Sequence, residues 1–161
     1  MSNDFYLFQI WSLFDRCVVV AKKELSYMGT FGYAIAICGA ILVDRFSEAG
    51  RKAINEAAQR AKSNGTSMFV FPEGTRNRKG GMLAFKKGAF HVALDIGVPI
   101  LPIVISEYEF LGPSRHDQFP PAEITIKILP PIDTEIFDKD AIDDLVHKTR
   151  ETMIRELNAA K

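Results

Sequence analysis

The fold class follows from residues 17–43, which read CVVVAKKELSYMGTFGYAIAICGAILV. The β-branched run at 17–21 predicts a buried strand, and residues 23–37 have the composition of a helix. A second short apolar run at 40–43 predicts another strand. A strand, a helix and a strand in this order are typical of an α/β protein with a largely parallel sheet.

The same alternation continues along the rest of the chain. Ser47 can cap a helix that Asn64 and Gly65 end. Further strands are predicted at 67–71 and 100–105, with a helix between them at 85–95. Ile124, Ile126 and Ile128 alternate with polar residues, which predicts a strand with one solvent-exposed face. A C-terminal helix is predicted from the spacing of apolar residues between Ile142 and Leu157. We therefore expect one layered α/β domain over residues 1–161, with a largely parallel central sheet flanked by helices.

Composition excludes several classes of protein. The chain has 161 residues, 47% of them hydrophobic, so it can bury a core and is not disordered. Its formal net charge is zero, which argues against nucleic acid as a partner. Cys17 and Cys38 lack the C-x-x-C spacing of a zinc site and stand in apolar surroundings, so we expect reduced core thiols, a cytosol-facing compartment and no metal.

The uncharged run at 25–43 is long enough to be considered as a transmembrane span. Gly29, Gly32 and Gly39 interrupt it, and it ends on a strand-like apolar run before Asp44. We therefore prefer a buried helix that leads into a buried strand. Residues 1–5 carry no basic and apolar pattern of a secretory signal.

The most informative stretch for chemistry is FPEGTRN at 71–77, directly after a predicted strand. Pro72 ends the strand, and Gly74 lets the backbone turn close to a ligand. Thr75 and Arg76 then offer a hydroxyl group and a forked cation, which together suit a phosphate. The alternative is a solvated turn with a surface charge run.

Other cations surround this loop in the sequence. Arg78, Lys79, Lys86 and Lys87 make it locally basic in a neutral chain. Arg45 also stands at the end of a predicted strand and could reach the same crevice. Its alternative interpretation is a surface pair with the neighbouring Asp44, which would contribute little to stability.

Four blocks in this order resemble the conserved blocks of the glycerolipid acyltransferases. They are GAILVDR at 39–45, FPEGTR at 71–76, FKKGAF at 85–90 and VPILPI at 98–103. The resemblance is closest to the 1-acyl-glycerol-3-phosphate acyltransferases and runs over residues 4–129. It implies transfer of a fatty acyl group from acyl-CoA to lysophosphatidate, which gives phosphatidate in phospholipid biosynthesis.

The resemblance also implies roles for particular residues. In the family, the histidine of an H-x-x-x-x-D motif is the general base, and the aspartate of the motif orients that histidine. Asp4 stands where this aspartate is expected. The histidine would therefore precede Met1. We therefore expect an N-terminally truncated domain that is inactive as it stands. The residues implied to bind substrate are Arg45, Glu73, Gly74, Thr75, Arg76 and Lys86. No cofactor is implied, since acyl-CoA is a co-substrate.

The histidines that the chain does contain are interpreted as structural or surface residues. His91 and Asp95 have the spacing H-x-x-x-D inside another block, and His116 and His147 follow no strand that points at the presumed crevice. The resemblance implies membrane lipids as partners and the endoplasmic reticulum membrane as location, with the domain facing the cytosol.

A second hypothesis belongs to a different class of function. A non-catalytic relative could bind lysophosphatidate or phosphatidate through Arg45, Thr75 and Arg76 without turning it over. A nucleotide-binding α/β domain is a weak third hypothesis, because no G-x-x-x-x-G-K or G-x-G-x-x-G follows a predicted strand.

Overall fold

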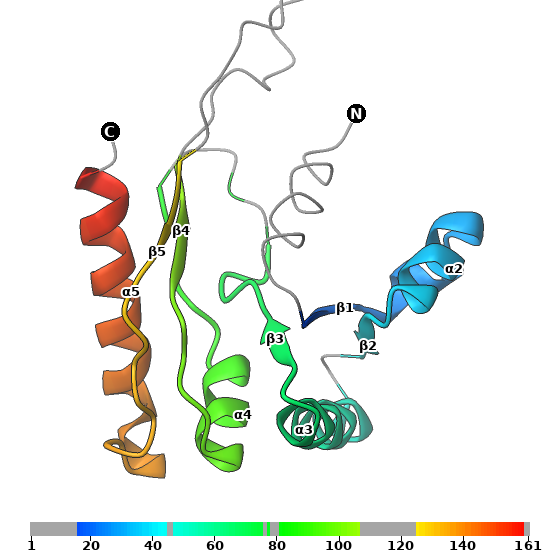
Figure 1. Ribbon diagram of the computed structural model, residues 1–161, viewed down its shortest axis with the longest axis horizontal. Helices are drawn as coiled ribbons and strands as arrows, with labels where there is room; N and C mark the ends of the chain where they lie inside the picture. The colour runs from blue at the N-terminus through cyan, green and yellow to red at the C-terminus, as the bar shows by residue number, and fades with distance from the viewer. Residues whose placement is uncertain (1–15, 45–46, 76, 78–80, 107–124, 160–161) are drawn as a thin grey trace, which may run out of the picture. The chain divides into compact units, whose positions relative to one another are not determined.

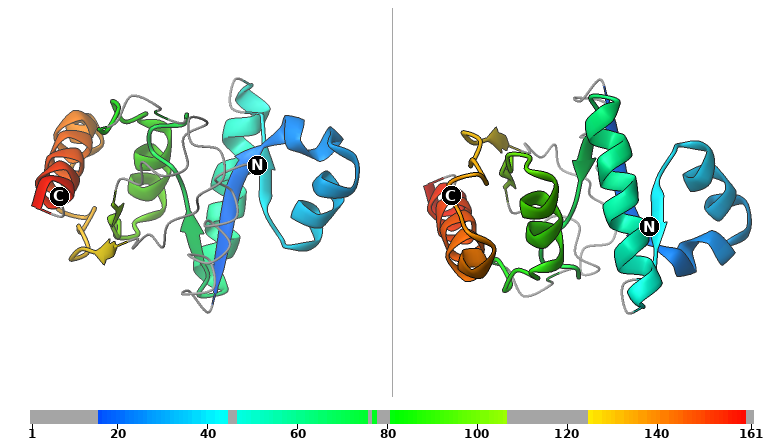
Figure 2. Two further views of the ribbon diagram at one scale, coloured as in Figure 1. Left: turned by 90° about the horizontal axis from the view of Figure 1, so that it is seen from above. Right: turned by 90° about the horizontal axis from the view of Figure 1, so that it is seen from below.

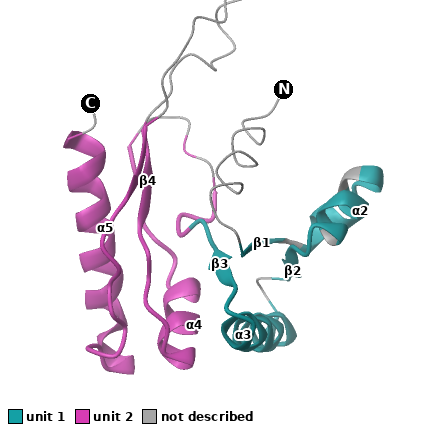
Figure 3. Ribbon diagram, in the orientation of Figure 1, with its two compact units in different colours: residues 1–71 teal, residues 72–161 magenta. Residues whose placement is uncertain are grey.

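The computed structural model describes residues 16–44, 47–75, 77, 81–106 and 125–159 (Figure 1). Contacts within the chain divide it into two compact units, Met1–Phe71 and Pro72–Lys161 (Figure 3). The expectation of a single domain over residues 1–161 stays a prediction.

The first unit is built on a parallel sheet of three strands. β1 (Cys17–Lys22) lies between β2 (Ile41–Val43) and β3 (Ser67–Phe69). The two neighbours pair with different halves of β1: its first three residues pair with β3 and its last three with β2. The predicted strands and their parallel pairing are confirmed, although β3 is shorter than the predicted 67–71.

Helix α3 (Glu48–Ser63) connects β2 to β3 and packs along the sheet (Figure 2). Ser47 caps it as predicted, because its Oγ accepts a hydrogen bond of 2.9 Å from the Gly50 backbone N–H. Gly50 has no room for a side chain, since a Cβ there would collide with the Asp44 carbonyl oxygen. The face toward the sheet is made of small residues, with Ala57, Ala58 and Ala61 buried.

The uncharged run at 25–43 folds differently from the prediction. A 3-10 helix, η1 (Lys23–Tyr27), precedes α2 (Gly29–Ile37), so the predicted helix is interrupted at Met28. The expectation of a buried helix is wrong: Tyr33 is 71% and Ile37 68% exposed. In the parts of the chain that the structure describes, no helix is both long and apolar enough to cross a membrane.

The second unit contains α4 (Gly88–Ile96) and an antiparallel pair of strands, β4 (Ile103–Ile105) and β5 (Ile126–Ile128). Helix α4 begins three residues later than predicted and ends at Gly97, whose φ of +60° suits a helix C-terminus. β4 and β5 run antiparallel, whereas all strand pairs of the sheet in the first unit are parallel. The isoleucines of β5 were expected on the face of the strand that is protected from solvent. This prediction is wrong for Ile128, which is 54% exposed.

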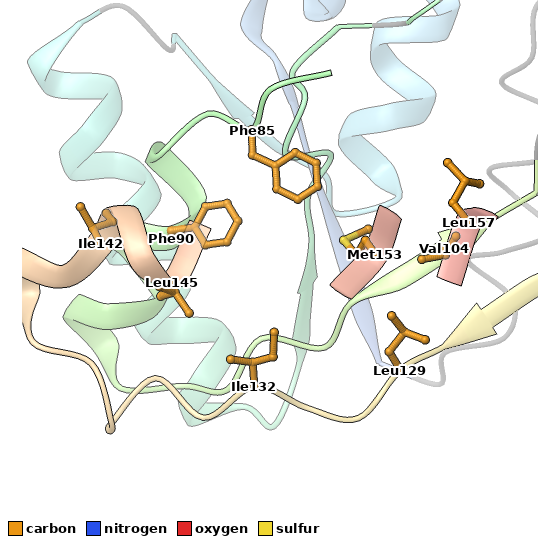
Figure 4. Close-up of a cluster of buried hydrophobic side chains, with 9 residues drawn as sticks. All are labelled: Phe85, Phe90, Val104, Leu129, Ile132, Ile142, Leu145, Met153 and Leu157. Carbon is orange, nitrogen blue, oxygen red and sulfur yellow. The ribbon is translucent and has the colours of Figure 1, made fainter. Parts of the chain in front are cut away.

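The core of the second unit lies between α4, the two strands and the C-terminal helix α5 (Ile142–Ala159) (Figure 4). A short 3-10 helix, η3 (Lys139–Ala141), leads into α5. Leu145 is fully buried, and the rings of Phe85 and Phe90 stack with their centroids 6.1 Å apart. The buried cluster consists of Phe85, Phe90, Val104, Leu129, Ile132, Ile142, Leu145, Met153 and Leu157.

Candidate substrate-binding loop

Two hydrogen bonds connect the loop at 72–75 to the segment at 82–86. The Pro72 carbonyl oxygen accepts a hydrogen bond of 2.8 Å from the Lys86 backbone N–H. The Oε2 atom of Glu73 accepts another, also 2.8 Å, from the Leu83 backbone N–H. A carboxylate that accepts a backbone hydrogen bond holds that backbone in place, so Glu73 stabilises the shape of the loop.

Gly74 turns the loop under the side chain of Lys86. Its φ is +67°, a left-handed conformation that glycine adopts without steric cost. A Cβ on Gly74 would lie 3.0 Å from both Cδ and Cε of Lys86 and 3.3 Å from its Nζ. The lysine side chain therefore lies directly against the loop. The close approach of Gly74 to a ligand stays a prediction.

The charge of Lys86 is available to an anion. Its neighbour Lys87 forms an ion pair with Asp143, with Nζ and Oδ1 2.6 Å apart. Lys86 has no carboxylate partner in the described part of the chain, and its side chain is exposed. Thr75, with its hydroxyl group, is exposed as well. The structure thus brings together four of the predicted substrate-binding residues: Glu73, Gly74, Thr75 and Lys86.

The segment at 82–86 is itself held by the C-terminal helix. Arg150 of α5 donates from Nε to the Leu83 carbonyl oxygen at 2.9 Å and from Nη2 to the Met82 carbonyl oxygen at 2.7 Å. The sequence alone does not reveal this contact, because an arginine on a helix with charges on its outer side is indistinguishable from a solvated one. No spacing or motif signals the contact.

Other predicted site residues lie outside the described residues. These are the orienting carboxylate Asp4 and the phosphate-binding candidates Arg45 and Arg76, and their roles stay predictions. Arg78, Lys79 and His116 lie outside the described residues as well.

The described histidines have surface positions. His91 is exposed, and the nearby Asp95 receives a hydrogen bond of 2.8 Å from Lys139 Nζ. His147 Nδ1 lies 3.4 Å from Glu151 Oε2, and both side chains are largely exposed. These positions agree with the interpretation of both histidines as surface residues.

Neither cysteine has the fully buried position expected for a core thiol. Cys17 is partly buried and Cys38 is exposed, so the prediction is wrong for Cys38. Loss of hydration through burial raises the pKa of the Cys17 thiol, and a hydrogen bond with the Phe69 backbone opposes that shift in part. Among the described residues, no group of three or more His, Cys, Asp or Glu side chains could hold a metal ion.

Comparison with known proteins gives the family of the chain. The family model described as "Acyltransferase" matches residues 2–106, which include the loop at 72–75 and Lys86. The chain belongs to the acyltransferase family. The resemblance expected from the four sequence blocks is confirmed.

Acyltransferases of known name match most of the chain. It is 39% identical over 142 residues to 1-acyl-sn-glycerol-3-phosphate acyltransferase alpha of Mus musculus, a match that covers 87% of this chain and 50% of the mouse protein. It is 36% identical over 144 residues to the 1-acyl-sn-glycerol-3-phosphate acyltransferase of Saccharomyces cerevisiae, covering 88% and 48%. The chain spans about half the length of the curated relatives it matches.

A solved structure confirms the fold class. The crystal structure of the 1-acyl-sn-glycerophosphate (LPA) acyltransferase PlsC from Thermotoga maritima superimposes with a TM-score of 0.66 and 26% sequence identity. The match covers 90% of this chain and 56% of the crystallised one. The prediction of an α/β fold with a parallel sheet flanked by helices is therefore confirmed.

Proposed function

We propose that this acyltransferase uses acyl-CoA to acylate the free hydroxyl group of lysophosphatidate, which gives phosphatidate for phospholipid biosynthesis. The hydroxyl oxygen attacks the thioester carbonyl carbon, an ester bond forms and the C–S bond breaks. The hydroxyl proton passes to a general base and then to the departing thiolate. The likeness to 1-acyl-sn-glycerol-3-phosphate acyltransferases over 87% of the chain supports this substrate pair.

The observation that carries the proposal is the exposed Lys86 ammonium group against the glycine turn of the loop at 72–75. A phosphate monoester carries up to two negative charges and three acceptor oxygens, so it binds where cations and hydroxyl groups gather. Lys86 and the hydroxyl group of Thr75 supply such groups, and Arg76 adds a forked cation next in the sequence. We assign the acceptor phosphate to this loop, and the role of Arg45 in substrate binding stays a prediction.

Glu73 has a different role in this proposal. Its carboxylate would repel a phosphate, whereas its Oε2 atom already accepts a hydrogen bond from the Leu83 backbone. Glu73 therefore shapes the loop that binds the substrate.

Transfer requires a general base as well as a binding loop. None of the three histidines of the sequence is followed by an aspartate five positions later, the spacing that the family motif requires. We propose that residues 1–161 alone bind the acceptor and do not turn it over, because a base contributes about 10²–10⁴ in rate. Asp4 would orient a histidine supplied ahead of it.

Binding of the acceptor is the direct test of this function. A short-chain lysophosphatidate below its micelle concentration and the matching monoacylglycerol would be titrated by calorimetry. We expect Lys86→Ala and Arg76→Ala to weaken lysophosphatidate binding about tenfold or more, because each removes a charged hydrogen-bond donor. Lys87→Ala is the control, since Lys87 is adjacent and pairs with Asp143. Equal binding of the two lipids by the unaltered chain would contradict the proposal.

An acyl-transfer assay separates the enzyme from the second hypothesis, a non-catalytic phospholipid-binding relative. The chain would be extended by an upstream segment that carries the H-x-x-x-x-D motif ending at Asp4, and release of the CoA thiol would be followed with lysophosphatidate as acceptor. Transfer by the extended protein supports the enzyme. Tight binding of lysophosphatidate without any transfer by the extended protein supports the binding relative.

We also propose that the chain works at a membrane surface, which α2 contacts. This helix carries no charged residue, and Tyr27, Met28, Tyr33 and Ile37 around it are all more than half exposed. An exposed surface of this kind is typical of a site that meets lipid or a partner, and lipid agrees with the proposed substrate. Residence in the endoplasmic reticulum, with the domain facing the cytosol, stays a prediction.

Co-sedimentation with vesicles of phosphatidylcholine and phosphatidate tests the membrane contact. The double variant Tyr33→Ser and Ile37→Ser should bind the vesicles less well than the unaltered chain. Ile136→Ser is the control, because Ile136 is also 67% exposed but belongs to the other unit. Equal sedimentation of the double variant and the unaltered chain would exclude α2 as the contact.

A further inference from the structure

Arg150 connects the C-terminal helix to the backbone beside the loop at 72–75. Its guanidinium group donates two hydrogen bonds to successive carbonyl groups, those of Met82 and Leu83, at 2.7 and 2.9 Å. The side chain is half-buried, so these bonds are shielded in part from water. The residue is therefore held in one orientation by two partners.

Arg150 and Glu73 hold the same peptide unit, because the Met82 carbonyl group that accepts from Arg150 Nη2 and the Leu83 N–H that donates to Glu73 belong to one peptide bond. The Leu83 carbonyl oxygen faces Arg150, and the Leu83 N–H donates to Glu73 Oε2 at 2.8 Å. Three residues farther on, the Lys86 N–H donates to the Pro72 carbonyl oxygen at 2.8 Å. The segment that Arg150 holds is thus hydrogen-bonded to both Glu73 and Pro72 of the loop, through Leu83 and Lys86.

Both sides of this connection are anchored in the core. On α5, Thr149 and Met153 are buried on either side of Arg150 in the sequence. On the segment at 82–86, Phe85 is buried and the Met82 side chain packs against the same cluster. Because neither end can shift easily, the guanidinium group fixes the distance between the helix and the segment.

The geometry requires an arginine rather than any cation. A guanidinium group is planar and presents several N–H donors in a rigid fork, which matches two neighbouring carbonyl oxygens. A lysine at position 150 has one compact ammonium group and cannot hold both carbonyl groups in the same arrangement. A carbonyl group that loses its donor in a partly buried place must find water or move.

We propose that Arg150 is a positioning residue for the acceptor phosphate, an inference that rests on the proposed function. It acts through the segment at 82–86, which carries the Lys86 side chain to its place against Gly74 and holds Glu73 in the loop. Arg150 itself touches no substrate. Its loss moves the phosphate-binding groups relative to one another while the remainder of α5 stays packed.

Four variants separate this role from a simple contribution to stability. Arg150→Met removes both donors and keeps a long side chain, and Arg150→Lys keeps the charge without the fork. Leu157→Ala removes core contacts two turns farther along the same helix and leaves the two carbonyl contacts in place. Arg155→Met removes one positive charge from an exposed position on α5.

Each protein is titrated with a short-chain lysophosphatidate and with the matching monoacylglycerol, and the exchange of the Leu83 and Lys86 amide hydrogens is followed by NMR. We expect Arg150→Met and Arg150→Lys to weaken lysophosphatidate binding about tenfold, while monoacylglycerol binding stays the same. The Leu83 amide should exchange faster in both. Leu157→Ala should lower the melting temperature without changing the ratio of the two affinities, and Arg155→Met should change neither.

The outcomes distinguish the inference from the function on which it rests. If the unaltered chain prefers lysophosphatidate and Arg150→Met binds it equally well, the positioning role is overturned and the proposed function stands. A loss of affinity that Leu157→Ala or Arg155→Met reproduces also overturns it, since stability or net charge then explains the effect. If the unaltered chain binds the two lipids equally well, both the proposed function and the positioning role of Arg150 are overturned.

Discussion

Replacing Gly74 by alanine tests how closely Lys86 must lie against the loop at 72–75. The φ of +67° costs an alanine about 1–2 kcal/mol. The new Cβ would lie 3.0 Å from Cδ and Cε of Lys86, so the lysine side chain must retreat by a few tenths of an ångström. We expect Gly74→Ala to destabilise the fold and to move the ammonium group from its place beside the loop.

Gly81→Ala is the matched control for the backbone effect. Gly81 has a φ of +74°, and a Cβ there meets nothing within 4 Å. Both variants should lower the melting temperature by about 2–8 °C, which follows from the same strain of about 1–2 kcal/mol in a chain of this size. Only Gly74→Ala should also weaken the binding of short-chain lysophosphatidate, by about tenfold.

A double variant identifies the cause of the lost affinity. If displacement of Lys86 explains the effect, adding Lys86→Ala to Gly74→Ala reduces lysophosphatidate binding little further, because the same contact is removed twice. Calorimetric titration gives the affinity of each variant. Equal affinities of Gly74→Ala and Gly81→Ala for lysophosphatidate would refute the reasoning.

Other predictions concern stability and the two thiols. Ser47→Ala removes the acceptor of the Gly50 N–H and should lower the free energy of unfolding by about 1 kcal/mol in urea titrations; an unchanged midpoint would contradict the cap. Leu145→Ala empties a fully buried site and should cost about 2–5 kcal/mol by calorimetry, where a loss below about 1 kcal/mol would contradict its place in the core. Iodoacetamide should alkylate Cys38 faster than Cys17, because burial limits access to Cys17 and raises its thiol pKa. The thiolate fraction of Cys17 should rise with pH, and so should its rate of alkylation as followed by mass spectrometry. Equal alkylation rates of Cys17 and Cys38 at neutral pH would contradict the partial burial of Cys17.

Local signals were sufficient to predict much of the fold. The β-branched run of β1 predicts its strand, and Ser47 predicts the start of α3 through a single hydroxyl acceptor. Both depend on neighbours in the sequence, so no knowledge of the tertiary structure is needed. Gly74 belongs to the same group, because its positive φ follows from the turn itself.

Features that depend on distant partners were not predicted. The apolar composition of α2 indicated burial, but composition does not show which surface covers a helix, and Tyr33 and Ile37 are exposed. The antiparallel pairing of β4 and β5 depends on residues from both strands. Arg150 was missed for the same reason, because its partners are two backbone carbonyl groups far away in the sequence.

The central place of β1 has a consequence for how the first unit folds during synthesis. β1 is synthesised before the other two strands of its sheet. The half of β1 that begins at Cys17 stays unpaired until β3, which begins at Ser67, has been synthesised. At about 5–20 residues per second, several seconds separate the two segments. In that interval an apolar strand offers an open edge to other nascent chains. Aggregation therefore competes with folding at β1, and slower synthesis lengthens the interval in which it does so, whereas a chaperone that covers this strand protects it.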